Sequence, residues 1–286
     1  MDIAESLIKK QSHDHSGNGL PSYASILGEI CQESGVKLTW LSNNWVALLE
    51  KDEARCFTVG FKFNLNSAAA SQIADDKIAT YELLSHFGVP AVECRPLYEK
   101  DNPGSYAKNY QSERYIEDFF KKNRRHIVLK PNSGQEGINV YQISEMSQVK
   151  PVLEKIFRQG YLAAMCPFHE IRNEYRFIML DGEVRLAYMK ERNEDWRFNL
   201  SQGAIAARIE DASLYEKLLK LARQAVTILG IRFCSVDMIE TCDGDLMVME
   251  VNSGVATGKY LRQHPEDYGK VKQIYADVLE KMFAGS

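Results

Sequence analysis

The stretch RFCSVDMIETCDGDLMVMEVN (residues 232–252) reads as two apolar β-strands joined by a tight turn. An Asp-Gly pair, here at 243–244, is the strongest short-range signal for a hairpin, because a two-residue type I′ turn needs a positive φ at both central positions. With this pair in the loop, the register predicts Asp237 directly opposite Glu250, and Asn252 on the same face as Glu250. The hairpin therefore predicts two carboxylates and an amide side by side.

Opposed carboxylates of this kind need compensation. At a separation of about 5 Å they repel each other by roughly 3 kcal/mol when the effective dielectric constant is about 20. Either one carboxyl has a raised pKa, or a cation lies between the two. An Asp, Glu and Asn set offers oxygen ligands, which suit Mg²⁺ shared with substrate phosphates. The alternative is a solvated outer face of the hairpin, but the flanking apolar residues predict burial on at least one side.

A second stretch, IVLKPNSGQEGINV (residues 127–140), places a lysine at the end of an apolar strand and glycines in the turn that follows. Glycines let backbone N–H groups approach an anion closely, and Lys130 could then reach a phosphate. The pattern is not a P-loop, since no Gly-Lys-Ser/Thr follows. For this stretch taken alone, an ordinary hairpin with a snorkelling lysine remains the alternative.

A third stretch, EYRFIMLDGEVRLAYMK (residues 174–190), forms another predicted hairpin around an Asp-Gly pair. The same register argument places Glu174 and Arg176 on one face with Arg185. Further basic residues follow downstream, interleaved with acidic ones. A solvated sheet edge explains such a cluster unless a phosphate lies nearby.

Helices and strand hairpins alternate irregularly along the remaining chain. The positions of apolar residues, caps and glycine stops predict helices over 21–34, 67–87, 115–122, 149–158, 211–229 and 267–283. Hairpins interspersed with helices favour an α+β fold over a doubly wound parallel sheet.

The composition excludes several classes of protein. Of the 286 residues, 45% are hydrophobic and 26% charged, so the chain can bury a core and is not disordered. The net charge of −4 disfavours nucleic acid as a partner, because phosphate neutralisation needs a basic face. No apolar stretch approaches the ~18–20 residues of a membrane span. The six cysteines contain no CxxC pair, which predicts free thiols in a reducing compartment and hence a cytoplasmic protein.

Five segments follow one another in an order shared with a known family. They are SAAASQIADDKIATYELLSHFGVPAVE (67–93), KPNSGQEGINV (130–140), EYRFIMLDGEV (174–184), FNLSQGA (198–204) and the strand pair SVDMIE and LMVMEVN (235–252). Together they resemble the ATP-grasp carboxylate–amine ligases, a superfamily that includes cyanophycin synthetase, the ribosomal-protein glutamate ligases and the D-alanine–D-alanine ligases. The resemblance runs from about residue 40 to residue 264.

The resemblance implies an α+β ATP-grasp fold, in which two α+β subdomains grip ATP between them. It leads us to expect a flexible leader over 1–20, a short N-terminal α/β unit over 21–75 and an ATP-grasp domain over 76–286. Within that domain we expect a nucleotide-grip subdomain over about 90–165 and a catalytic, metal-binding subdomain over about 166–286.

The resemblance also implies a reaction. In this family ATP and a carboxylate give an acyl phosphate and ADP, after which an amine attacks to form an amide and release phosphate. Carried over by position, the contacts to the phosphates or adenine of ATP would be Lys77, Lys130, Ser133, Gly134 and Gly137. The strand with Met165, Cys166 and Phe168 would contact the adenine through backbone groups, and Glu174 would hold the ribose. The ligands of Mg²⁺, or of Mn²⁺, would be Asp237, Glu250 and Asn252. The residues facing the transferred phosphoryl group or the substrate carboxylate would be Arg176, Lys190, Arg197 and Asn199.

Two departures from the family leave part of the function open. NSGVATGKYLRQHPE (252–266) lacks the Pro-Gly that usually follows the metal carboxylate, which leaves the roles of Lys259 and Arg262 unassigned. The short N-terminal unit leaves the carboxylate and the amine unnamed beyond an amino acid or peptide. Two other functions also stay open: an ATP-grasp kinase that phosphorylates a small molecule, and a nucleotide-binding module without turnover. The resemblance to a family whose members often form dimers, together with the small N-terminal unit, suggests a homodimer.

Overall fold

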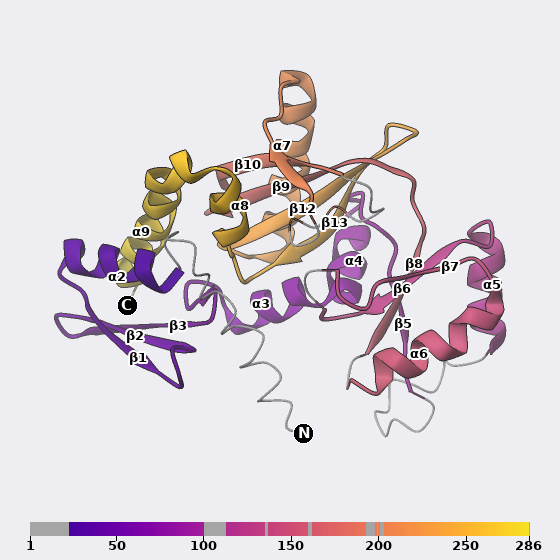
Figure 1. Cartoon of the computed structure of the whole chain (residues 1–286), viewed down its shortest axis with the longest axis horizontal. Coiled ribbons are helices and arrows are strands. Elements are labelled where there is room, and N and C mark those ends of the chain that lie inside the picture. The colour runs from indigo at the N-terminus through magenta and orange to yellow at the C-terminus, as the bar shows by residue number, and fades with distance from the viewer. Residues whose placement is uncertain are drawn as a thin grey trace.

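The computed structural model describes residues 23–99, 113–134, 137–159, 162–192, 198, 200 and 203–285. Within these residues the strands form three antiparallel sheets, and helices pack against each of them (Figure 1). Strand hairpins mixed with helices confirm the α+β class. The leader that we expected to be flexible, residues 1–20, lies outside the described residues.

The first sheet, the N-terminal sheet, follows helix α2 (Tyr23–Ser34). Its strands pair in sequence order: β1 (Lys37–Leu41), β2 (Val46–Lys51), β3 (Ala54–Val59) and β4 (Lys62–Phe63). The C-terminal helix α9 (Tyr268–Ala284) lies beside α2 over this sheet (Figure 1). Two short elements precede it, the helix α8 (Gly258–Gln263) and the 3₁₀ turn η5 (Pro265–Asp267).

The second sheet, the middle sheet, has four short strands. In pairing order they are β5 (Arg95–Leu97), β8 (Ala163–Pro167), β6 (Ile127–Pro131) and β7 (Tyr141–Ile143). One face packs against α5 (Glu113–Lys122), η3 (Met146–Gln148) and α6 (Val149–Phe157). The odd-numbered residues of β6 and β8 point into that packing, so their even-numbered residues point to the opposite face.

The third sheet, the large sheet, has five strands. In pairing order they are β11 (Ile205–Ala207), β10 (Glu183–Glu191), β9 (Ile171–Leu180), β12 (Phe233–Thr241) and β13 (Leu246–Asn252). Helix α7 (Ala212–Leu229) covers one face. It begins at its N-cap Asp211 and ends at Gly230, whose φ of 62° allows the left-handed cap. The opposite face packs on α9 at one end and is polar farther along.

The stretch predicted as one helix over 67–87 contains two, α3 (Ala68–Asp75) and α4 (Lys77–His86). The break is at Asp76, whose backbone is extended (φ −104°, ψ 108°). Its side chain accepts a hydrogen bond at 2.8 Å from the N–H three residues on. Asp76 is therefore the N-cap of α4, because an Asp side chain satisfies an unpaired N–H at the start of a new helix.

The two Asp-Gly turns of the large sheet differ. Asp181 and Gly182 both have a positive φ (50° and 79°), as predicted for a type I′ turn. At the other turn Gly244 has a positive φ of 90°, and the Thr241 N–H donates to the Asp245 carbonyl oxygen at 3.0 Å. That loop therefore has three residues, and the two-residue turn predicted there is wrong.

A β-bulge nevertheless restores the predicted register farther along this hairpin. Near the turn, Met238 pairs with Val248, one residue away from the prediction. The pairing then shifts, Met249 is the extra residue on β13, and Asp237 pairs with Glu250. The predicted opposition of the two carboxylates is correct, although the loop that was expected to set it has a different length.

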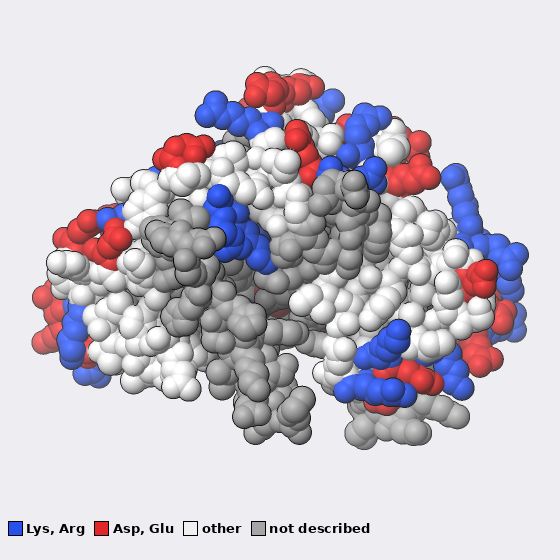
Figure 2. Space-filling view, viewed as in Figure 1, with Lys and Arg blue, Asp and Glu red and all other residues white. Residues whose placement is uncertain are grey.

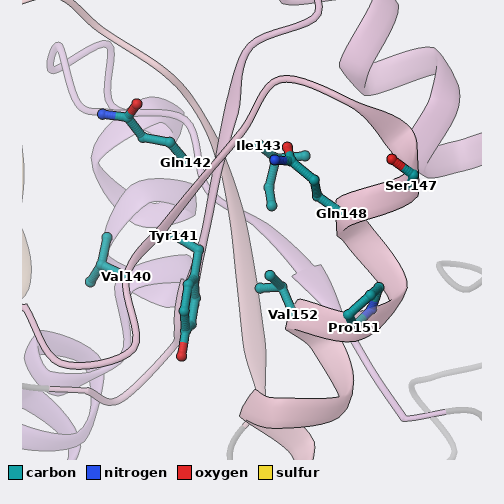
Figure 3. A pocket seen from close by; sticks show the side chains of 8 residues that line it. All are labelled: Val140, Tyr141, Gln142, Ile143, Ser147, Gln148, Pro151 and Val152. Carbon is teal, nitrogen blue, oxygen red and sulfur yellow. The ribbon is translucent and has the colours of Figure 1, made fainter.

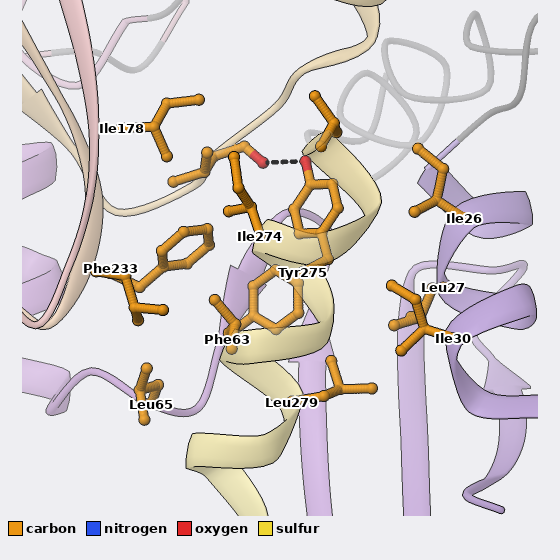
Figure 4. Packing of buried hydrophobic residues seen from close by; sticks show 14 of the residues in the cluster. Ile26, Leu27, Ile30, Phe63, Leu65, Ile178, Phe233, Ile274, Tyr275 and Leu279 are labelled. Carbon is orange, nitrogen blue, oxygen red and sulfur yellow. Dashed lines mark hydrogen bonds between the residues drawn. The ribbon is translucent and has the colours of Figure 1, made fainter. Parts of the chain in front are cut away.

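One hydrophobic cluster joins the N-terminal sheet to the large sheet (Figure 4). Phe63 stacks on Tyr275 of α9 with ring centroids 5.7 Å apart, and it meets Phe233 of β12 edge-on at 5.5 Å. The Tyr275 hydroxyl donates a hydrogen bond to the Val255 carbonyl oxygen at 3.0 Å. The N-terminal unit therefore shares its core with the large sheet.

Charged side chains of both signs are interspersed on the face shown in Figure 2. Basic side chains gather over α5 (Figure 2), where Lys121 and Lys122 are exposed. Lys121 pairs with Glu117 at 3.2 Å and Lys122 with Glu93 at 3.3 Å, so neighbouring acids partly neutralise this group. No helix in the described ranges combines the length and the apolarity that a membrane crossing requires.

Replacing Phe63 with Ala tests the shared core. The Phe63 side chain is 3% exposed, and its loss should lower the free energy of unfolding by about 3–5 kcal/mol, measured by urea denaturation. We expect one cooperative transition. The control is Phe57→Ala on the outer face of the same sheet, 43% exposed, with a change of less than about 0.5 kcal/mol. A separate early transition in Phe63→Ala, with the rest of the chain unchanged, would contradict the shared core.

Candidate active site

The predicted acidic residues meet on one face of the large sheet. Asp237 and Glu250 are Cα partners, and Asn252 pairs with Ser235 two residues farther along. Side-chain alternation places all three on the face opposite α7. The Asp237 side chain has no exposed surface, whereas that of Glu250 is 22% exposed. The predicted arrangement of the three residues is therefore present.

Cations of the protein itself neutralise the Asp237 carboxylate. Arg176 donates two hydrogen bonds, from Nε to Oδ1 at 2.8 Å and from Nη2 to Oδ2 at 2.6 Å. Lys190 Nζ donates to Oδ1 at 2.9 Å. Burial alone would raise the pKa of Asp237, but Arg176 and Lys190 outweigh it and hold the pKa well below its usual range. Asp237 is therefore ionised at neutral pH.

Glu250 is paired from the opposite side. Lys77 Nζ lies 3.3 Å from its Oε2 atom. The Asn252 amide donates to Glu250 Oε1 at 3.3 Å and to Asp237 Oδ2 at 3.2 Å, so it bridges the two carboxylates. Burial would raise the pKa of Glu250, but Lys77 and more distant lysines lower it. Both carboxyl groups thus have lowered pKa values, because the chain supplies the compensating cations itself.

A second β-bulge brings Lys190 of β10 to the site. A regular register from the type I′ turn predicts Arg185 on the face of Glu174. Beyond Arg185 the pairing shifts by one residue, and Lys190 takes the position opposite Glu174. Arg185 forms an ion pair with Asp277 of α9 at 3.1 Å. Because α9 packs on the face of Glu174, the prediction for Arg185 is correct. The bulge adds one residue to β10 and reverses the faces only of the residues beyond it, so Lys190 rather than Met189 lies opposite Glu174.

Glu174 lies beside Lys190 in the interior. It is 5% exposed and accepts a hydrogen bond from Lys190 Nζ. Burial raises the pKa of Glu174 to about 7, and the charge of Asp237 adds to this effect, although Lys190 opposes it. Its expected contact with the ribose of ATP stays a prediction.

Lys77 connects the helix α4 to two other parts of the site. Besides Glu250, its Nζ contacts the carbonyl oxygens of Asn132 at 3.3 Å and Gly134 at 2.9 Å. The Asn132 side-chain oxygen accepts a hydrogen bond from the Ile78 N–H at 3.1 Å. The start of α4 is therefore tied to the turn after β6 and to the carboxylates. The expected contact of Lys77 with ATP stays a prediction.

Asn132 is a site residue that the sequence analysis missed. It is 1% exposed and supports the helix that carries Lys77. A signal was present, since an Asn directly after a buried strand commonly bonds to nearby backbone groups. Nothing in the sequence indicated that its partner would be a helix more than fifty residues earlier.

The glycine turn after β6 has specific steric needs. A Cβ atom at Gly134 would lie 2.9 Å from the Pro131 Cβ, so the turn requires glycine there. Gly137 has a φ of 66°, which also favours glycine. Ser133 is exposed on this turn. Residues 135–136 lie outside the described part of the chain, and the predicted phosphate contacts of this turn are untested.

Lys130 lies on the face of the middle sheet that is turned toward the carboxylates. It is 8% exposed and pairs across the strands with Ala164 of β8. Burial would lower the pKa of Lys130, but Cys166, Cys94 and the carboxylates of Glu250 and Glu174 keep it above its ordinary value. Lys130 is therefore a buried charged group rather than a snorkelling surface lysine.

The side chains of the residues predicted to contact adenine through their backbone point in different directions. Cys166 shares the face of Lys130, whereas Met165 points into the cluster under α5 and α6. Phe168 follows β8 and stacks on His126, with ring centroids 3.8 Å apart. The Cys166 side chain thus faces the site and the Met165 side chain does not. The expected backbone contacts of this strand with adenine stay a prediction. Two further predicted residues, Arg197 and Asn199, lie outside the described residues.

A cavity of about 670 Å³ lies elsewhere, between β7 and α6 (Figure 3). Its lining includes Tyr141, Gln142 and Val152 and contains no charged side chain. A triphosphate needs cations around it. The face with the carboxylates and lysines is therefore the better candidate for a nucleotide.

The donor set fits a hard divalent cation. Asp237, Glu250 and the Asn252 amide oxygen would supply oxygen ligands, as Mg²⁺ or Mn²⁺ prefers. Among the residues that the structure describes, no cluster of three or more His, Cys, Asp or Glu could hold a metal. A cation at this site would therefore take its remaining ligands from water and from substrate phosphates.

Comparison with known families shows to which family the chain belongs. Residues 74–269 match the RimK-like ATP-grasp domain. The chain belongs to the RimK-like ATP-grasp family. This membership confirms the predicted superfamily and the ATP-grasp fold. It also confirms the predicted class of enzyme, an ATP-dependent ligase that forms a C–N bond.

Curated relatives of this RimK-like chain include two ligases. A tetrahydromethanopterin:alpha-L-glutamate ligase of Methanocaldococcus jannaschii is 34% identical over 133 residues, which is 44% of this chain and 44% of the relative. A probable alpha-L-glutamate ligase of Psychromonas ingrahamii is 26% identical over 275 residues, covering 91% of this chain and 79% of the relative. The first match thus spans less than half of either protein.

Solved structures share the fold at low identity. D-alanine–D-alanine ligase from Bacillus anthracis, complexed with ATP, has a TM-score of 0.58 and 20% identity, covering 76% of this chain and 68% of that one. The ATP-grasp ligase PsnB, complexed with a minimal precursor, Mg and ADP, has a TM-score of 0.52 and 16% identity, covering 76% and 62%. These similarities show that the RimK-like chain has the ATP-grasp fold.

Glu174→Gln tests the charge balance of the site. The pKa of Glu174 is about 7 in the folded protein, above its ordinary value near 4.3, so the folded state binds this proton more tightly. The stabilisation from that proton is present below about pH 4.5 and is lost as the pH rises to about 7. We expect the unfolding free energy of the wild type to fall relative to Glu174→Gln by about 2–3 kcal/mol over this range.

Urea denaturation at several pH values measures this difference. The control is Glu216→Gln, which replaces an exposed glutamate on α7 and should follow the wild type. Parallel curves for the wild type and Glu174→Gln would show that the Glu174 pKa is not raised.

Proposed function

We propose that this chain joins L-glutamate to a small-molecule or peptide substrate through an amide bond, with release of ADP and phosphate. The observation that supports this proposal most is the set of Asp237, Glu250 and Asn252, of which Asp237 is fully buried, on a face turned toward Lys130 of the neighbouring sheet within the RimK-like region. The two curated relatives described above are named as glutamate ligases, which supports glutamate as one substrate.

The proposed reaction has two steps. A carboxylate oxygen attacks the γ-phosphorus of ATP, which gives an acyl phosphate and ADP. The amine then attacks the acyl carbon, and phosphate leaves. Such a sequence needs no side-chain nucleophile, since positioning and charge neutralisation carry most of the catalysis.

We assign the charged side chains of this chain as follows. Asp237, Glu250 and Asn252 would hold Mg²⁺, which would neutralise charge on the phosphates. Lys130 and the glycine turn would bind the phosphate oxygens. Lys190 is 4% exposed, and we assign it to orienting Asp237. The side chain of Arg176 is 24% exposed, so its guanidinium can hold Asp237 and still face a substrate carboxylate.

Localisation and assembly belong to the same proposal. The six cysteines are free, and five of them are buried, which supports a reducing compartment such as the cytoplasm. A homodimer stays a prediction.

The direct test supplies the chain with Mg·ATP, L-glutamate and one carboxylic acid or short peptide at a time. ADP release and the mass of the product are measured. We expect ADP only with a suitable pair of substrates, together with a product that carries one added glutamyl group. Glutamate could supply either the carboxylate that is activated or the amine that attacks. Glutarate, which lacks the amine, tests which role applies, because it can supply only the carboxylate.

Hydroxylamine separates the proposal from its alternatives. Trapping of an acyl phosphate as a hydroxamate supports the ligase. ADP release with a stable phosphorylated alcohol would instead establish the kinase. Binding of Mg·ATP with no ADP across the whole panel would establish the nucleotide-binding module, and either of these outcomes would overturn the proposed ligation.

Glu250→Gln tests the metal assignment. Glu250 is partly exposed, so the variant should stay folded, whereas Asp237→Asn would weaken the partner of two buried cations and destabilise the protein. We expect glutamate-dependent ADP release to fall by about 100-fold or more, because one charged metal ligand is lost. The matched control is Glu240→Gln on the same hairpin, with little change in rate. Wild-type turnover in Glu250→Gln would remove Glu250 from the metal site.

A further inference from the structure

Two cysteines face each other beneath the lysine-lined side of the site. Cys94 directly precedes β5 and, by extension of the β5–β8 register, lies opposite Cys166. Their Sγ atoms are 2.9 Å apart, and both residues are almost completely buried. Cross-strand neighbours at this distance can form a disulfide with little movement, because the S–S bond length is about 2.05 Å.

The surroundings of this pair distinguish its two sulfurs. Burial would raise the pKa of Cys166, but the hydrogen bond from Cys94 and the charges of Lys130 and Lys77 lower it to about 7. The pKa of Cys94 is raised by its hydrogen bond with Cys166 and by burial. A thiolate next to a protonated thiol is the arrangement of an attacking cysteine and a resolving cysteine.

We propose that Cys94 and Cys166 form a redox-modification site, which peroxides oxidise to an intramolecular disulfide that weakens nucleotide binding. The thiolate of Cys166 attacks one peroxide oxygen, and the O–O bond breaks to give a sulfenic acid and hydroxide, which takes up the proton that the Cys166 thiol released and becomes water. The Cys94 sulfur then attacks the sulfenic sulfur, the S–S bond forms, the S–O bond breaks, and a second water carries away the Cys94 proton. The two thiols together lose two electrons to one hydrogen peroxide.

The effect on nucleotide binding follows from the position of Cys166, and this step rests on the proposed function. Cys166 lies on the same face of the middle sheet as Lys130, on the adjacent strand. Bond formation moves the two sulfurs together by roughly 0.9 Å and removes the thiolate that faces Lys130. Displacements of this size next to bound substrate have large consequences, so we expect the affinity for Mg·ATP to fall about tenfold.

The experiment treats the full chain with hydrogen peroxide and maps disulfides by mass spectrometry of a non-reduced digest. Affinity is measured separately, by titration of a fluorescent ATP analogue with Mg²⁺. We expect a peptide pair linked through Cys94 and Cys166, a mass loss of about 2 Da, and weaker binding that dithiothreitol restores. Neither readout requires ligation, so an absence of glutamate-dependent ADP release would not mask the result.

Two variants separate this pair from other thiol chemistry. Before oxidation Cys94→Ser should bind Mg·ATP like the wild type, and on oxidation it should form no linked peptide pair and show no mass loss of about 2 Da. Cys94→Ala serves if the serine variant fails to fold. Cys242→Ser removes the exposed cysteine and should keep the full response. Oxidation at Cys242 with no link between Cys94 and Cys166 would overturn the proposal. A link that leaves the affinity unchanged would overturn its effect on the nucleotide site.

Discussion

The site depends on one buried charge. Asp237 has no exposed surface, and a carboxylate in such a position is tolerated only where cations and hydrogen-bond donors surround it. Arg176 on β9, Lys190 on β10 and Asn252 on β13 supply them. The order of four adjacent strands, β10-β9-β12-β13, is therefore what makes the charge possible. Any rearrangement of these strands would remove at least one of these partners from Asp237.

The same logic extends to the neighbouring sheet. The helix break at Asp76 places Lys77 in the first turn of α4, where Glu250 and the glycine turn share its ammonium group. Asn132 fixes that helix to the end of β6. The face of the middle sheet and the face of the large sheet are thus joined by a lysine that belongs to neither. Carboxylates and lysines nearly balance across this junction, so a triphosphate would need a divalent cation of its own to enter it.

Much of this arrangement was predictable from local patterns. The alternation in 232–252, the lysine before the glycine turn and the order of five segments led to the ATP-grasp fold and to Asp237, Glu250 and Asn252. Lys130 and Glu174, which were also predicted, lie close to this set of residues. Asn132 was missed because its role depends on a helix distant in sequence.

What the sequence alone determined is the periodicity of its strands, the chemistry of its turns and the identity of its charged groups, since these depend on neighbouring residues. The tertiary structure decided the rest. A bulge at Met249 offset the three-residue loop and kept Asp237 opposite Glu250. A bulge at Arg185 turned Lys190 rather than Met189 toward Asp237. Bulges change which face a side chain takes, and they form where a twisted sheet must fit its helices and its buried charges, a condition that no local pattern contains.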